Sequence, residues 1–233
     1  SHLNGKMVSS LTHHSIIRYA PQMKNGKALD KCPDNDGHNV DSADAIITSI
    51  PVGLISSSSS QAMKDAANMV LLTRNSKTSA GHAALFASTL RSVILGATVK
   101  EATIAAANEL DYDVKRVVER DGNRPGTNPV HAWYLPSSFP AMLYMSYKYG
   151  STGNGEDSFR NGVLANAMRG GENVATGAMI GALLGAECGY NNLPKHLVSG
   201  LMKSQQEQMN REIDSFIQKI PFAKSFSSST SDL

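Results

Sequence analysis

The chain has 233 residues, of which 41% are hydrophobic, and this content is enough to bury one continuous core. Its 22 basic and 20 acidic residues leave a net charge of only +2, which argues against a protein that binds the nucleic-acid backbone. The most apolar stretch, Val174 to Ala186, is shorter than the roughly 20 residues of a membrane-spanning helix, so we expect no membrane partner.

The cysteines and the two ends of the chain indicate the location and the extent of the protein. Cys32 and Cys188 lie far apart without a metal-type spacing, and no secretory segment opens the sequence, which predicts a cytoplasmic or otherwise intracellular protein. The chain begins with Ser1-His2 and not with a methionine. We therefore expect that it begins partway into a longer protein. We predict one domain over residues 1–223 and a disordered, serine-rich tail over residues 224–233.

Helical patterns begin in the first half of the chain. Apolar residues recur with helical spacing over residues 60–72 and again over residues 82–95, where Gly96 is a typical residue after a helix end. Thr98-Val-Lys-Glu101 has the spacing of a capping box and predicts a third helix that ends near Leu110. These helices follow one another without a convincing strand between them.

The second half continues in the same way. Pro136, Ser138 and Pro140 predict the start of a helix that ends at Gly150, and another is predicted over residues 157–169. Gly170-Gly171 then breaks the chain, Asn173 is the expected cap of a long apolar helix, and Pro194 starts a final amphipathic stretch to about Ile220. About seven helices result, so the predicted fold is all-α, a compact orthogonal multi-helix domain.

The long apolar helix carries glycine at every fourth position. Each of these residues costs about 0.8–1 kcal/mol relative to alanine in a helix interior. We therefore expect them to allow close packing against a neighbouring helix: Gly177, Gly181, Gly185 and Gly189.

The segment Gly170-Gly171-Glu172-Asn173 is the most informative part of the sequence. Its glycines permit a positive φ, and Glu172 and Asn173 lie at the predicted N-terminus of a buried helix, where backbone N–H groups converge. A carboxylate in this position either binds a hard cation or caps the helix. The local pattern of two glycines followed by two polar residues favours the cap.

Other polar residues give weaker signals. His82 reads more readily as a polar group at a helix end than as a catalytic base, and Asp41 and Asp44 fit a turn that leads into a helix. The remaining histidines considered have no zinc-type spacing: His13-His14, His38 and His131.

The order of several segments resembles the ADP-ribosylglycohydrolase family, and the Glu-Asn version of the loop is closest to its J-type lens crystallin branch. The resemblance covers roughly residues 37–205. The segments that carry it are Asp44 to Leu54, Ser79 to His82, Trp133 to Tyr149, Phe159 to Asn173, Gly177 to Ala186 and Leu193-Pro194. It implies an all-α fold and a magnesium-assisted hydrolase that releases a group from the distal ribose of ADP-ribose.

The resemblance also implies a set of site residues. The family's metal loop reads Gly-Gly-Asp-Thr-Asp-Thr, so Glu172 is the expected metal ligand and catalytic carboxylate, whereas Val174 and Ala175 offer only backbone carbonyls. The family's Asp-Asp and Gly-Asp-Ala segments have no counterpart here. The expected ligand-binding residues are Asp44, His82, Gly170, Gly171 and Asn173.

Three hypotheses follow. The first is a hydrolase, with weak or altered activity, acting on the glycosidic bond of ADP-ribose attached to a protein or small acceptor. The second is a non-catalytic, crystallin-like structural protein of the same fold. The third is a helical scaffold that binds protein partners through the amphipathic segment Met202 to Ile220.

Overall fold

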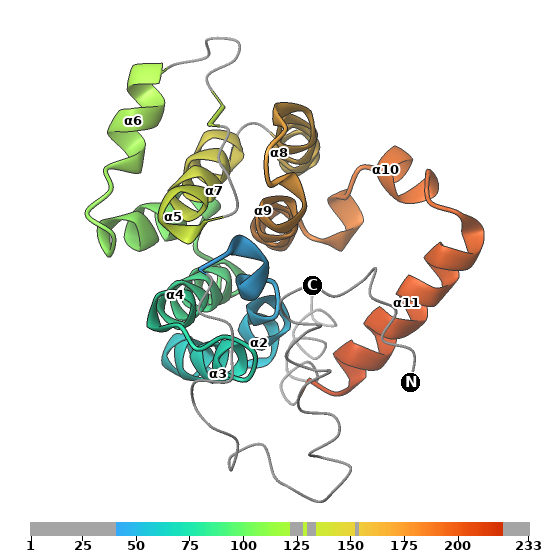
Figure 1. Cartoon of the computed structure of the whole chain (residues 1–233). Coiled ribbons are helices and arrows are strands. Elements are labelled where there is room, and N and C mark those ends of the chain that lie inside the picture. The colour runs from blue at the N-terminus through green and yellow to red at the C-terminus, as the bar shows by residue number, and fades with distance from the viewer. Residues whose placement is uncertain (1–40, 122–127, 130–133, 152–153, 221–233) are drawn as a thin grey trace, which may run out of the picture.

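The computed structural model describes residues 41–121, 128–129, 134–151 and 154–220. In these residues the fold is all-α, as predicted, with no β-strand and only an isolated bridge between Ser42 and Tyr134. The elements shown in Figure 1 are η3 (Ala43–Ile46), α2 (Ser49–Ile55), α3 (Ser59–Leu71), α4 (Lys77–Ile94), α5 (Val99–Asn108), α6 (Val114–Asp121), α7 (Leu135–Tyr149), α8 (Gly155–Arg169), α9 (Asn173–Cys188), η4 (Tyr190–Asn192), α10 (Lys195–Ser199) and α11 (Lys203–Gln218).

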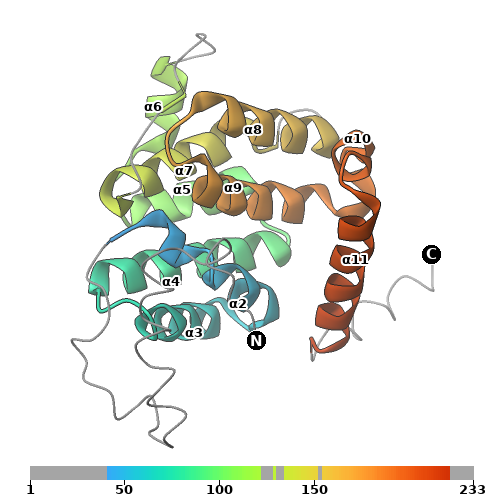
Figure 2. The same cartoon turned by 45° about the vertical axis from the view of Figure 1, so that its right-hand side comes forward.

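Helix α4 is the centre of this arrangement. It packs against η3, α2, α3, α5, α7 and α9, while α8 lies along α9 on the far side (Figures 1 and 2). Phe86 and Leu90 of α4 and Met142 of α7 are fully buried where these helices meet. Burial of such large apolar side chains stabilises each by about 1.5–3 kcal/mol relative to exposure, which fixes the helices around a single core.

Several predicted helix ends are confirmed. Thr98 and Glu101 form the predicted capping box at the start of α5. Gly96 has a φ of +106° after α4, and Gly170 and Gly171 have φ values of +74° and +72° after α8. Glycine adopts this left-handed region without the steric cost that other residues meet.

Three helix starts differ from the prediction. Helix α4 begins at Lys77, because Ser76 caps it by accepting the Ser79 backbone N–H at 3.0 Å, so His82 lies inside the helix. Helix α7 already contains Pro140, which the sequence pattern placed at its start. Helix α9 is capped by Glu172, whose side chain accepts the Ala175 N–H, and Asn173 is the first helical residue.

The described part of the chain also holds short helices for which the sequence pattern gave no bounds. Helices α2 and α6 are only 7 and 8 residues long, too short for a clear periodic signal. The final amphipathic stretch is two helices, because α10 ends at Gly200 before α11 begins at Lys203. None of the described helices combines the length and apolar character needed to cross a membrane.

The prediction about the glycines of α9 is correct only in part. A Cβ added at Gly177 would lie 2.7 Å from the Asn166 side chain, and one at Gly185 would lie 3.4 Å from the Phe159 ring. At Gly181 and Gly189 an added Cβ would meet nothing within 4 Å, and Gly189 instead adopts a positive φ of +76° after the helix. Only part of the series therefore permits close packing.

Some predictions fall outside the described residues. They concern the chain start and the tail at residues 224–233, together with Cys32, His13-His14, His38, His131 and Trp133.

Candidate functional site

The predicted site residues gather at one end of the helical bundle. At the opposite end, Glu187 near the close of α9 accepts backbone N–H groups from Val99 at the start of α5 and from Ser151 just after α7, at 2.7 and 2.9 Å. Helices α7 and α9 pack against each other and their ends lie together. Their starts therefore lie together at the other end of the bundle, as Figure 2 shows. We call this the site end, and it is formed by residues 41–46, 76–82, 134–139 and 169–176.

The segment that contains Asp44 is anchored to the site end by backbone and side-chain hydrogen bonds. The Leu135 N–H donates to the Asp41 carbonyl at 3.0 Å, which joins this segment to the start of α7. The Asp41 carboxylate accepts hydrogen bonds from the hydroxyls of Ser76 and Ser79 in the first turn of α4. Element η3 then packs between α4, α7 and α9.

Asp44 is paired with a buried arginine. Arg74 Nη2 donates to Asp44 Oδ2 at 2.9 Å, and the Arg74 side chain is fully buried whereas that of Asp44 is 19% exposed. The Ser42 hydroxyl donates to the other carboxylate oxygen. The structure therefore gives Asp44 a definite role in balancing a buried charge, beside its predicted contact with a ligand.

His82 projects from the second turn of α4 with a defined ring orientation. Its Nδ1 lies 2.8 Å from the Thr78 carbonyl, and its ring meets the Phe139 ring edge-on with centroids 4.9 Å apart. Because a carbonyl only accepts, Nδ1 carries the hydrogen, and in the neutral ring Nε2 is left as an acceptor. His82 can thus accept a hydrogen bond from a ligand hydroxyl.

The loop between α8 and α9 presents Glu172 at a helix N-terminus. Glu172 Oε1 accepts the Ala175 N–H at 3.1 Å, so one oxygen caps the helix. The carboxylate has a second oxygen with lone pairs of its own. Asn173 turns back toward α8 and donates from Nδ2 to the Ala167 carbonyl at 3.2 Å.

Arg169 holds this loop in place. Its guanidinium donates to Asn166 Oδ1 at 3.1 Å, to the Pro129 carbonyl at 2.5 Å and to Thr176 Oγ1 at 2.6 Å. Burial lowers the pKa of Arg169 from its ordinary value, and the nearby negative charge of Glu172 acts in the opposite direction. An arginine stays protonated despite such a shift, so the Arg169 guanidinium keeps its charge beside the Glu172 carboxylate.

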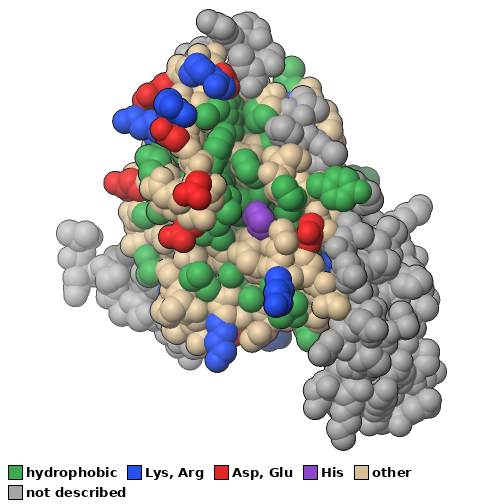
Figure 3. Space-filling view, turned by 60° about the vertical axis from the view of Figure 1, so that its left-hand side comes forward, with side chains coloured by type: hydrophobic (Ala, Val, Ile, Leu, Met, Phe, Trp, Pro, Cys, Tyr) green, Lys and Arg blue, Asp and Glu red, His purple; other side chains and the backbone are tan. Residues whose placement is uncertain are grey.

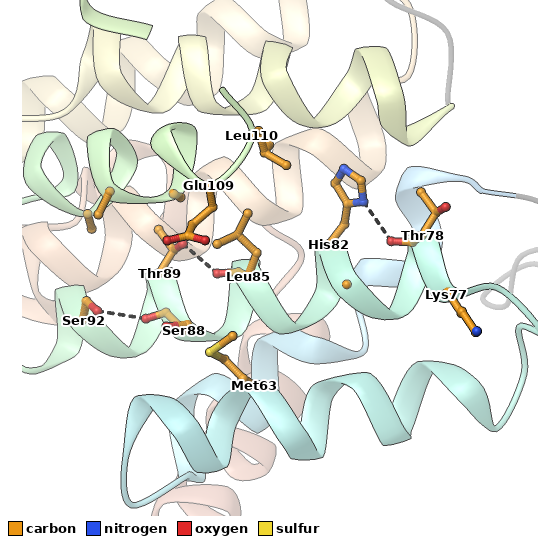
Figure 4. A pocket seen from close by; sticks show the side chains of 14 residues that line it. Met63, Lys77, Thr78, His82, Leu85, Ser88, Thr89, Ser92, Glu109 and Leu110 are labelled. Atoms are coloured by element: carbon orange, nitrogen blue, oxygen red, sulfur yellow. Dashed lines mark hydrogen bonds between the residues drawn. The ribbon is translucent and has the colours of Figure 1, made fainter. Parts of the chain in front are cut away.

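A cavity of about 630 Å³ opens beside His82, between α3, α4 and α5. Figure 3 shows hydrophobic side chains gathered in this hollow, and Figure 4 shows His82 at one end of it. Neither Asp44 nor the loop 170–173 lines the cavity, so it shares only His82 with the predicted site. Its other lining residues are Met63, Lys77, Thr78, Gly81, Leu85, Ser88, Thr89, Ser92, Ala102, Ala105, Ala106, Glu109 and Leu110.

Comparison with known protein families shows which family the chain belongs to. A family model described as ADP-ribosylglycohydrolase matches residues 4–225, which is nearly the whole chain. The chain belongs to the ADP-ribosylglycohydrolase family. A comparison with curated proteins gives no match.

The acidic side chains of the described residues can be compared with the magnesium site that the resemblance implies. No group of three histidine, cysteine or acidic side chains comes together within them. The carboxylates of Asp41, Asp44 and Glu172 already accept hydrogen bonds from protein donors. Val174 is 75% exposed and has only a backbone carbonyl to offer a hard cation. Within the described residues, therefore, no cluster of three such side chains is available to hold a metal ion.

Arg74 and Arg169 are the important residues of this family member that the sequence pattern missed. Arg74 lies 30 positions from Asp44, and Arg169 bonds to Pro129, which is 40 positions away. Arg74 is preceded by a helix end and followed by polar residues, so nothing local predicts its burial. Arg169 stands directly before Gly170-Gly171, and this adjacency to the loop is the one signal that was available.

Proposed function

We propose that this member of the ADP-ribosylglycohydrolase family is a hydrolase that releases ADP-ribose from a protein or small acceptor, with weak or altered activity. Family membership supports hydrolysis of this general type. The observation that carries the proposal is the convergence of Asp44, His82 and the loop 170–173 at one end of the bundle. The ligand would be an ADP-ribose-type nucleotide sugar or an ADP-ribosylated substrate.

Glu172 is the residue to which we assign catalysis. Glycosidic hydrolysis needs a carboxylate that can accept a proton from the attacking water. One oxygen of Glu172 is fixed by the Ala175 N–H, which orients the group, and the second oxygen is available for that proton. Thr176 and Arg169 contact the Glu172 carbonyl and restrain the loop backbone.

The neighbouring residues are assigned to ligand binding. Gly170 and Gly171 adopt positive φ values and carry no side chains, so a ligand could approach the loop backbone closely. His82 would supply an acceptor for a ribose hydroxyl, and Asn173 would contact the ligand through its amide oxygen, since its Nδ2 is bonded to Ala167. Asp44 would contact the sugar through the exposed part of its carboxylate. Glu172 is also the proposed contact for a magnesium ion, although no catalytic step above depends on one. An intracellular location remains a prediction.

The test is calorimetric titration of the purified chain with ADP-ribose, with and without magnesium. We expect binding that Glu172→Ala weakens at least about tenfold, since a hydrogen bond involving a charged group contributes roughly 1.5–3 kcal/mol. Glu156→Ala is the matched control, because Glu156 is also an acid at a helix start but lies at the opposite end of α8. The absence of heat from the folded wild-type chain would contradict the proposal.

A second candidate is a crystallin-like structural protein of the same fold. The observation that favours it is that Glu172, Asp44 and Asp41 are all already engaged in capping or pairing. Such a protein would bind no nucleotide sugar, and replacing Glu172 would change only its stability, through the loss of the α9 cap. The same titration therefore separates the two candidates.

A further inference from the structure

Helix α11 is an amphipathic helix that contributes no residue to the core. None of its residues is buried, and Ile213 and Ile217 are 40% and 47% exposed. Figure 2 shows α10 and α11 leaving the end of α9, with α11 running in a different direction from the helices of the bundle. In the described part of the chain, α11 has no extensive packing partner.

The apolar residues of α11 form one narrow stripe. Met209, Ile213 and Phe216 of α11, together with Ile220 two residues beyond its last helical residue, are spaced by four, three and four residues, which is the spacing of a coiled-coil seam. On a helix with 100° per residue these four side chains stay within a small arc, and Ile217 widens it on one side. A seam of this kind pairs with a second helix.

The charged residues beside the seam select the pairing direction. Glu212 and Lys219 both lie on the same flank, two helical turns apart, so they are too distant to contact each other within one helix. In an antiparallel pair that sets Ile213 opposite Phe216 of the second copy, Glu212 faces Lys219 of the second copy. Two-fold symmetry repeats this pair, which gives two opposite-charge contacts.

Other registers bring like charges together. Shifting the antiparallel pair by one heptad in one direction places Glu212 opposite Glu212 of the second copy. Shifting it in the other direction places Lys219 opposite Lys219 of the second copy. A parallel pair leaves Glu212 opposite Ile217 of the second copy and forms no ion pair. Charge complementarity therefore favours a single antiparallel register.

We propose that α11 joins two copies of this chain as a short antiparallel coiled coil, with Glu212 paired to Lys219 of the other copy. The occupant of this partly exposed stripe is thus a second copy. The seam spans only about two heptads, so we expect weak self-association that depends on protein concentration.

The test is sedimentation equilibrium of the full chain and of charge variants. Glu212→Lys and Lys219→Glu each replace two attractive contacts by two repulsive ones, and each should weaken the dimer about tenfold or more. The double variant Glu212→Lys/Lys219→Glu should restore it. Glu207→Lys is the matched control, because it makes the same charge change on the outward face of α11 and should leave the dimer unchanged.

Mixing the two single variants gives the sharpest test. A heterodimer of the Glu212→Lys chain and the Lys219→Glu chain contains two opposite-charge pairs, so the mixture should dimerise although each variant alone does not. Circular dichroism checks that each variant is folded. A chain that stays monomeric at all concentrations, because another part of itself covers Ile213, would overturn the proposal, and so would a dimer insensitive to both charge reversals.

Discussion

The pairing of Asp44 with Arg74 is the interaction at the residue scale on which the site end depends most. A guanidinium that is fully buried needs an anion nearby, because its transfer from water costs several kcal/mol. Asp44 supplies this anion across 30 positions of sequence, and it thereby fixes η3 against the segment that leads into α4. The predicted ligand role of Asp44 is thus coupled to folding.

Replacing Asp44 should therefore destabilise the protein as well as alter its site. We expect Asp44→Asn to lower the free energy of unfolding by about 3 kcal/mol, since it removes a carboxylate that is paired with a buried guanidinium. Denaturant unfolding measures this change. The double variant Asp44→Asn/Arg74→Met should recover part of the loss, and an unchanged midpoint for Asp44→Asn would mean that the pair contributes nothing.

At the scale of single elements, the capping box of α5 is predictable from four residues and is confirmed in detail. Thr98 Oγ1 accepts the Glu101 N–H at 3.2 Å, and Glu101 Oε2 accepts the Thr98 N–H at 2.9 Å. Hydrogen bonds from the Thr98 backbone, and then from its side chain, lower the pKa of Glu101. The folded state thus favours the ionised carboxylate.

The stabilisation by Glu101 should depend on pH in a defined direction. Because its pKa is lower in the folded state, the stabilisation is present above its unfolded value of about 4.3 and is lost as the pH falls through the folded value. We expect Glu101→Gln to lower the thermal midpoint at pH 7 and to match the wild type at about pH 2. Glu109→Gln, at the other end of the helix, is the control. An equal deficit at both pH values would contradict this assignment.

Helices without such local signals were missed or misplaced. Helix α6 buries Val114 and packs Val117 and Val118 against the core, but its 8 residues are too few for a repeating apolar pattern. Helix α4 begins more than one turn before the apolar pattern suggested, because Ser76 supplies its cap. Local hydrogen bonding, rather than hydrophobic periodicity, sets these boundaries.

At the scale of the whole molecule, Glu187 ties together helices that are distant in sequence. It accepts the N–H groups of Val99 and Ser151, which are 88 and 36 positions away. This contact holds the start of α5 and the end of α7 against the end of α9. It thereby sets the relative positions of the helix starts at the site end, on the other side of the bundle.

Glu187→Ala should consequently cost more than an ordinary surface substitution. We expect a loss of about 2 kcal/mol in the free energy of unfolding, because two backbone N–H groups lose a charged acceptor. Urea unfolding tests this value. Glu119→Ala, which breaks an exposed pair with Lys115, should change stability by less than about 0.5 kcal/mol. Equal effects of the two substitutions would show that Glu187 does not link the helices.

The sequence by itself determined the all-α class, most long helices, the capping box and the glycine break at 170–171. Each of these depends on residues within about one or two helical turns, so a local pattern contains the information. Only the tertiary structure decided that Arg74 is buried against Asp44, that His82 lies inside α4 beside Phe139, and that Arg169 holds the loop of Glu172. These contacts join residues far apart in the chain, and they form only when the core brings the helix starts together at one end.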